Sequence, residues 1–216
     1  MPRDLLGRMA APALPIAEQG PLKRYLDTLN NILRLFFNLI TATMNRLTGE
    51  LGGRFLDIPN GLFYSTADQA IAVINTAQVV SFENTYLSSG VTINGGSNSQ
   101  ITVTYSGVYN FQFVAQGVST SASAKNVYVW MRRDGTDIGY SARHMVLSGS
   151  NDSNVISWNF NIDVQAGSYI EMMWSSGDID TKLDTETAVS PHPGEPSAVI
   201  AVTFVSALPD PVPTPP

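Results

Sequence analysis

Val108-Tyr109-Asn110-Phe111-Gln112-Phe113-Val114-Ala115-Gln116 is a segment in which an aromatic or small apolar residue occupies every second position. Successive side chains of a β-strand point to opposite faces, so Tyr109, Phe111 and Phe113 share one face. Three aromatic rings on one face of a strand are typical of a buried core. The segment therefore predicts a long strand that covers the interior of a β-domain.

The same alternation recurs downstream, where turn residues such as Asp134-Gly135 separate short apolar runs. Further strands are predicted at 126–132, 155–164, 169–175 and 199–205, and weaker ones at 72–82, 91–93, 100–105, 138–148 and 182–187. Roughly eight to ten short strands without a second helical pattern are typical of a β-sandwich or jelly roll. We therefore predict a mainly β, antiparallel jelly-roll β-sandwich and exclude a parallel α/β fold.

A different pattern precedes these strands. Pro21 is suited to a first helical position, and neither glycine nor proline follows before Gly49, which predicts one helix over residues 21–48. Such a helix is ~40 Å long at the usual rise per residue. Its polar residues alternate in steps of four and three and so form one narrow stripe: Asp27, Asn31, Arg34, Asn38, Thr41 and Asn45.

The rest of this helix is apolar. One seam contains Leu22, Tyr25, Leu29, Ile32, Phe36 and Leu39, and the next contains Leu26, Leu33, Ile40 and Leu47. Two adjacent seams are too wide for a surface helix and favour a parallel coiled coil of three or more strands, which makes the first seam the predicted trimerisation surface. The alternative is a helix that lies across its own β-domain or across a neighbouring protein.

The two ends of the chain are rich in proline. Pro12, Pro15 and Gly20 interrupt residues 1–20, which predicts an irregular arm that docks on a partner through apolar side chains. These docking residues are Leu5, Leu6, Met9, Leu14 and Ile16. The composition changes after Gly52-Gly53, so the expected organisation is an arm at 1–20, a trimerising helix at 21–48, a linker at 49–69, a jelly roll at 70–206 and a Pro-rich tail at 207–216.

The composition argues against several kinds of partner and of site. The net charge is −6 and the basic residues are scattered, which argues against nucleic-acid binding. The chain has no cysteine, so neither disulfides nor thiolate metal sites brace it. The apolar run at residues 35–40 is far shorter than the ~20 residues that a membrane span needs, so we expect no membrane insertion.

The sequence offers little for catalysis, and we predict no enzyme, no catalytic residue, no cofactor and no metal. The two histidines, His144 and His192, are interpreted as a surface residue and as part of a rigid Pro-rich loop. Asp178, Asp180 and Asp184 are interpreted as a solvated acidic loop, because their spacing lacks the features of an EF-hand calcium site. A small hydrolase is the least favoured interpretation.

Four segments carry a resemblance to a known family. Gly107 to Phe113, Arg133-Asp134-Gly135, Ala166-Gly167-Ser168-Tyr169-Ile170-Glu171 and Ala201-Val202-Thr203-Phe204-Val205 follow the order and character of the C1q/tumour-necrosis-factor-like jelly roll. This resemblance covers roughly residues 70–206 and agrees with the fold predicted from the alternation.

A narrower resemblance is to structural proteins of tailed bacteriophages of marine and freshwater bacteria. It is carried by Gly61-Leu62-Phe63-Tyr64, residues 66–69, the strand around Trp130 and Pro191-His192-Pro193-Gly194. It implies a homotrimer mounted on the virion, as a capsid decoration protein or head fibre, assembled in the host cytoplasm on capsid, portal or tail proteins. The alternative is a tail-associated fibre whose jelly-roll tip binds a glycan or protein of the host cell surface.

Overall fold

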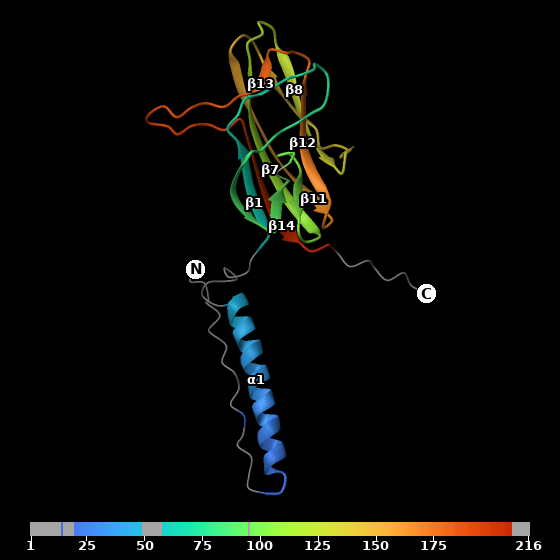
Figure 1. Ribbon diagram of the computed structural model, residues 1–216, viewed down its shortest axis with the longest axis vertical. Coiled ribbons are helices and arrows are strands. Elements are labelled where there is room, and N and C mark those ends of the chain that lie inside the picture. Colours follow the sequence, from blue (N-terminus) through green and yellow to red (C-terminus); the bar gives the residue numbers. More distant parts are fainter. Residues whose placement is uncertain (1–13, 15–19, 49–57, 95, 209–216) are drawn as a thin grey trace, which may run out of the picture. The chain divides into compact units, whose positions relative to one another are not determined.

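The computed structural model describes residue 14 and residues 20–48, 58–94 and 96–208 (Figure 1). The chain divides into two compact units, Met1–Asp57 and Ile58–Pro216. The described part of the first unit is essentially one helix, and the second unit is a β-domain that we call the head. The two units are described separately below.

The helix α1 spans Lys23–Thr48. It begins just after Pro21, where the Lys23 amide donates to the Gly20 carbonyl at 3.0 Å. An ion pair between Lys23 Nζ and Asp27 Oδ2 at 3.1 Å joins the first two turns. The absence of glycine and proline within α1 explains why it runs without a break.

The head contains two antiparallel sheets. Sheet A has the order β4-β1-β14-β7-β11. In addition, β13 pairs with β7, and β2 pairs with β13. Its strands are β1 (Asn60–Ser65), β2 (Gln69–Ala70), β4 (Asn84–Ser89), β7 (Gly107–Ser119), β11 (Asp152–Val164), β13 (Thr181–Leu183) and β14 (Ala198–Ser206).

Sheet B has the order β10-β8-β12-β6-β5, with β3 beside β12 and β9 beside β8. Its strands are β3 (Gln78–Val79), β5 (Val91–Ile93), β6 (Ile101–Val103), β8 (Lys125–Arg133), β9 (Thr136–Asp137), β10 (Arg143–Leu147) and β12 (Tyr169–Ser176).

The strand order identifies the fold. Without the short pieces at the sheet margins, the eight principal strands in chain order are β1, β6, β7, β8, β10, β11, β12 and β14. Numbered one to eight, they form the sheets 1-8-3-6 and 2-7-4-5, which is the arrangement of a jelly roll. The predicted fold class, an antiparallel jelly-roll sandwich preceded by a long helix, is confirmed.

The longest ladder of the head joins β7 to β11. It pairs every residue from Gly107↔Val164 to Ser119↔Asp152. The inner face of β7 carries Tyr109, Phe111, Phe113 and Ala115, each at most 1% exposed, as the alternation predicts. The Phe113 ring packs edge-on against Trp158 at 5.3 Å and against Phe82 at 6.4 Å, so aromatic rings fill the middle of the core.

The margins of sheet A differ from the sequence prediction. The jelly roll begins at β1, inside the expected linker at 49–69, and β4 was not predicted at all. The buried positions of β1 are Gly61, Phe63 and Ser65. Two of these side chains are too small or too polar to produce an apolar alternation, so the strand leaves no signal in the sequence.

Two predicted strands are also shorter than expected. Within 72–82 only β3 is a strand, and within 138–148 only β10 is. The apolar residues Val80 and Phe82 are fully buried in the core. These two residues are therefore apolar because they fill the core from a loop, and not because they belong to a strand.

Both chain ends leave the head at the same end of the sandwich. β1 and β14 are antiparallel neighbours, and the Phe204 amide near the end of β14 donates to the Pro59 carbonyl at 2.9 Å, just before β1. The loops that follow β7 and precede β11 lie at the opposite end of these strands.

Candidate oligomer interface

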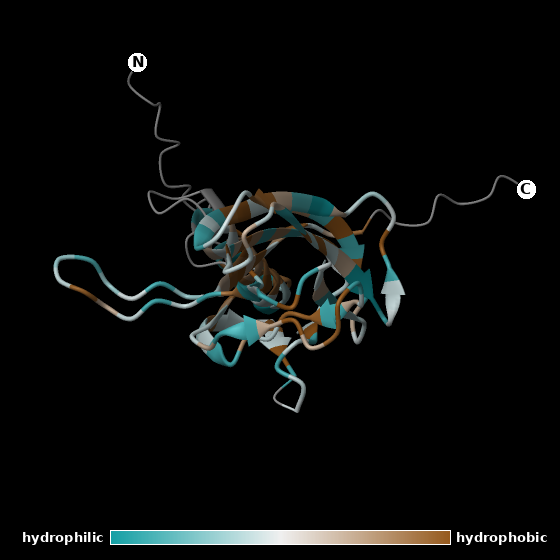
Figure 2. Ribbon diagram, turned by 90° about the horizontal axis from the view of Figure 1, so that it is seen from above, coloured by the Kyte–Doolittle hydropathy of each residue, from teal (hydrophilic) through white to brown (hydrophobic). Residues whose placement is uncertain are grey.

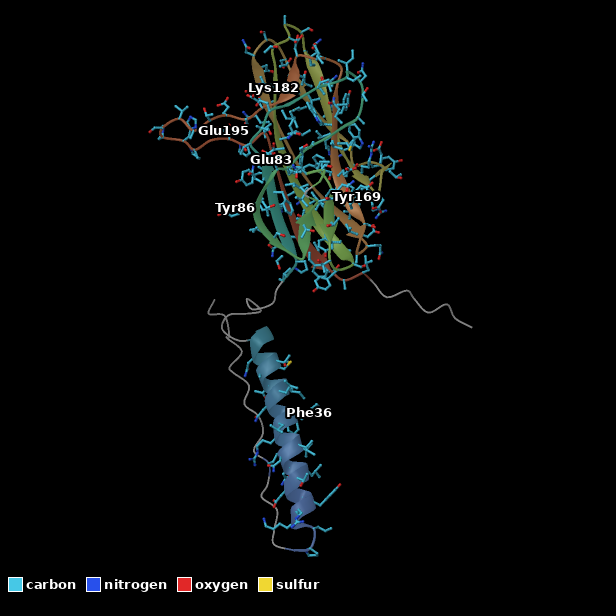
Figure 3. All side chains as sticks on the ribbon, viewed as in Figure 1. Phe36, Glu83, Tyr86, Tyr169, Lys182 and Glu195 are labelled. Atoms are coloured by element: carbon cyan, nitrogen blue, oxygen red, sulfur yellow. The ribbon has the colours of Figure 1, made fainter. Side chains whose placement is uncertain are left out.

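The six predicted trimerisation residues follow one another at alternating spacings of three and four, with Leu22 just before α1 and the other five within it. Their side chains are between 39% and 68% exposed: Leu22, Tyr25, Leu29, Ile32, Phe36 and Leu39. Figure 3 shows Phe36 on the helix. In the second seam, Leu26 and Ile40 are 40% and 39% exposed, and Leu33 is half-buried. An apolar surface of this extent is what a coiled-coil seam presents before its partners are added.

The free energy available at this seam is large. Burial of one Leu, Ile or Phe side chain contributes about 1.5–3 kcal/mol, so six side chains contribute on the order of 10 kcal/mol per chain. In proteins, most of the stability of a helix comes from the packing of its apolar face. A partner that covers the seam would therefore stabilise α1. The described part of the chain includes no helix that could itself cross a membrane.

The predicted docking residues of the N-terminal arm are mostly outside the described residues. Leu5, Leu6, Met9 and Ile16 belong to this group, and Leu14 is described as half-buried. Their docking role stays a prediction.

The residues considered for chemistry are dispersed over the head. His144 is exposed, with its ring centroid 5.6 Å from that of Tyr128, and His192 Nδ1 lies 3.1 Å from the Pro193 carbonyl oxygen. Asp178 is paired with Lys125 at 2.7 Å. Over residues 20–48, 58–94 and 96–208, no three His, Asp or Glu side chains gather closely enough to hold a metal ion.

An ion cluster fixes the segment that follows β13. Lys182 Nζ lies 2.6 Å from Asp68 Oδ2 and 2.5 Å from Asp184 Oδ1. The hydrogen bond from Lys182, and then that from the Thr185 amide, lowers the pKa of Asp68, while hydrogen bonds to Asp184 and Asp68 raise the pKa of Lys182. The cluster thus ties β2 to the chain that leaves sheet A. Figure 3 labels Lys182.

We expect Lys182→Met to lower the free energy of unfolding of the head at neutral pH by roughly 0.5–1 kcal/mol, because solvent screens this partly exposed cluster. Since the pKa of folded Asp68 lies below its ordinary value of 3.8, its contribution is present above that pH and is lost as the pH falls through the folded pKa. The difference between variant and wild type in urea unfolding is therefore expected to shrink from pH 7 to pH 3. Lys182→Arg is the control that keeps the charge, and an equal difference at both pH values would contradict the assignment.

Sequence reasoning missed several exposed aromatic residues, of which Tyr140 is the most exposed. Tyr140, in the loop between β9 and β10, is 99% exposed and has a positive φ of 61°. Trp174 is buried in the core, and Phe204 packs on Tyr109 at 5.4 Å. Tyr140 had no signal in the sequence, because its surroundings predicted a strand.

Comparisons with known proteins concern the head. No protein-family model and no curated protein matches the chain. A solved structure described as the globular domain of zebrafish complement 1qA protein is similar, with 17% sequence identity and a TM-score of 0.45 over 70% of this chain and 99% of that one. The structure of Eiger TNF from S. frugiperda is similar with 12% identity and a TM-score of 0.48, covering 73% of this chain and 99% of that one. The jelly-roll assignment rests on the strand order itself.

Proposed function

We propose that the protein is a non-enzymatic structural component of a bacteriophage virion: a homotrimeric capsid decoration protein or head fibre. Residues 1–20 anchor it to the particle, and the head projects from it or clamps neighbouring capsid subunits. The observation that carries the proposal is the apolar seam of α1, which exposes six large side chains in heptad spacing. The placement on a virion rests on the phage-type resemblance in the sequence.

The trimeric state follows from the width of the apolar surface. A two-stranded coiled coil buries a single narrow seam, whereas here Leu26 and Ile40 extend the exposed surface beyond it. A third helix covers this second seam. The polar stripe with Asp27 and Arg34 then faces water, as a soluble stalk requires.

Attachment works by avidity. Three arms on one stalk bind the particle jointly, and each arm after the first binds at a high effective concentration. An arm that is weak by itself therefore suffices for stable attachment. This also explains why the arm and the trimerising helix adjoin each other in the chain.

Removal of residues 1–20 is expected to leave a trimer that no longer joins the particle. The measurement compares the solution mass of the shortened protein with its incorporation into particles assembled without the wild-type copy. A matched variant keeps the arm and replaces Leu5, Leu6 and Met9 by serine, and it is expected to behave like the deletion. Normal incorporation of the shortened trimer would refute docking through the arm.

A second candidate function is a tail-associated fibre whose head binds the host surface. The observation in its favour is Tyr140, a fully exposed aromatic residue on a loop, since sugar faces stack on aromatic rings. The arm-deleted trimer separates the two candidates, because it is expected not to adsorb to host cells if the protein is a decoration protein. Saturable adsorption of this trimer would favour the fibre.

A further inference from the structure

The chain between β13 and β14, residues 184–197, forms a hairpin that projects from the head, and we call it the side hairpin (Figure 1). Backbone hydrogen bonds join its two arms: the Glu186 amide to the Glu195 carbonyl at 3.0 Å, the reverse bond at 2.8 Å, and the His192 amide to the Val189 carbonyl at 2.9 Å. Residues 186–195 are all exposed. At ~3.3 Å per residue, the tip reaches about 15 Å beyond the first pair.

The base of the side hairpin is held firmly, although its tip is not. The Asp68 carboxylate accepts from the Thr185 amide at 3.0 Å, and the Thr185 hydroxyl donates to the Glu195 carbonyl at 2.7 Å. The tip contains Val189, which is 59% exposed, and the exposed Pro191 and Pro193. Figure 2 shows a hydrophobic segment near the end of an otherwise hydrophilic loop. An isolated two-stranded hairpin is marginally stable in water, so a surface that covers the exposed tip would stabilise it.

The charges of the side hairpin also lack partners. Glu186 and Glu195 lie directly opposite each other, and neither side chain has a cation within the described chain. Like charges at paired positions destabilise a hairpin unless a cation lies nearby. Figure 3 labels Glu195 on this hairpin. The covering surface should therefore be basic.

A groove with matching properties lies between β10 and β11. It has a volume of about 480 Å³ and is lined by residues 143–146 and 154–158. Among the described residues, Arg143 at its margin has no carboxylate partner, whereas Arg132 and Arg133 are paired with Asp137 and Asp163. The groove thus offers the cation that the side hairpin lacks.

The strands along the groove have no backbone partner on the groove side. Within the described residues, β10 pairs only with β8 and β11 pairs only with β7. The Asn154 side chain bridges part of the gap, because its Nδ2 donates to the Val146 carbonyl at 3.1 Å and its Oδ1 accepts from the Val155 amide at 2.9 Å. The exposed side chains of Arg143, Val146 and Val155 remain available to an extended segment.

We infer that the side hairpin of one protomer docks in the β10–β11 groove of the next copy of the same chain. The two surfaces belong to opposite margins of the sandwich, since β11 ends sheet A on one side and the hairpin emerges beyond β14, near Tyr64 of β1, on the other. Two different, complementary patches form a heterologous contact, which closes into a ring when the rotation is threefold. The inference rests on the homotrimer proposed above and adds a contact between its heads.

In the docked arrangement, Arg143 lies between the facing Glu186 and Glu195 and offsets their repulsion. The apolar tip with Val189 covers the exposed Val146 and Val155 of the groove. The same contact occurs three times in a ring, so a modest interaction at each position contributes appreciably to the cohesion of the trimer.

Cysteine cross-linking tests this contact cleanly, because the chain has no cysteine of its own. The full-length variant carries Val189→Cys at the hairpin tip and Ser157→Cys in the groove, and it is treated with a short bis-maleimide. Covalent dimers and trimers are expected on denaturing gels. The matched control carries Val189→Cys with Tyr105→Cys, which is 61% exposed and outside the groove, and it is expected to remain monomeric on the gel.

A charge exchange tests the recognition itself. When Arg143→Glu is added to the variant with Val189→Cys and Ser157→Cys, the cross-linking yield is expected to fall at least about threefold. The further changes Glu186→Arg and Glu195→Arg are expected to restore the yield. Light scattering before cross-linking gives the mass. A trimeric mass without cross-links, or a yield unaffected by the charges, would overturn the hairpin contact alone. A monomeric mass would overturn the homotrimer as well.

Discussion

Full-length protein carrying Phe36→Asp is expected to be monomeric in solution, in contrast to the trimer that we propose for the wild-type chain. Phe36 lies in the middle of the α1 seam and is 55% exposed in the single chain, so it meets its counterparts only in the oligomer. The substitution removes about 1.5–3 kcal/mol of burial per chain and introduces three carboxylates at the axis, whose desolvation adds several kcal/mol. Light scattering measures the mass, and circular dichroism is expected to show a loss of helix, because the apolar face of α1 loses the packing that supplies most of a helix's stability.

Asn38→Asp is the matched control, since it adds the same charge two residues away on the polar stripe. It is expected to leave both mass and helix content unchanged. If the Phe36 variant remained trimeric, the seam would not hold the oligomer together. A trimer that persisted through contacts of the heads alone would assign self-association to the jelly roll.

Trp174→Ala is expected to lower the free energy of unfolding of the head by about 3–5 kcal/mol. Trp174 is 1% exposed and is the largest of the fully buried side chains, and β8, β6 and β3 surround its strand, so the cavity cannot collapse readily. For a domain of this size the melting temperature is expected to fall by roughly 10 °C. Urea and thermal unfolding measure both quantities.

Trp130→Ala is a useful comparison, because Trp130 is only half-buried and its indole donates to Asp137 at 2.9 Å on the outer face of sheet B. Trp130→Ala is expected to lower the free energy of unfolding of the head by clearly less than Trp174→Ala does. Equal effects would mean that the core does not depend on Trp174, contrary to its burial.

The predictable part of the fold is the part where large side chains alternate. β7 and β11 carry aromatic or branched residues at every second position, and this pattern alone places them across the core. β1 has the same burial pattern, but Gly61 and Ser65 occupy its inner positions, so the pattern is invisible in the sequence. The 72–82 segment shows the converse: apolar residues that fill the core from a loop resemble a strand.

The candidate interface likewise has a part that the sequence predicts and a part that only the fold shows. The helical seam is a local periodicity and can be read directly, so its six residues were predicted. Pairing of charges depends on register and on distant loops instead. The sequence does not distinguish Arg132, Arg133 and Arg143, and only the fold shows that Arg143 forms no ion pair with a carboxylate in the described part of the chain. The opposition of Glu186 and Glu195 likewise requires the turn at Pro191 to be known.

The shared exit of both chain ends has a consequence for the use of this scaffold in display engineering. Because Pro59 and Phe204 are hydrogen-bonded neighbours, a cargo fused directly after Leu208 emerges beside β1, at the pole where the chain enters the head. Cargo intended for the opposite pole of the head belongs instead in the connections 120–124 or 148–151, at the far ends of β7 and β11. Insertions there lengthen surface loops, which costs little conformational entropy, and leave the long β7–β11 ladder intact.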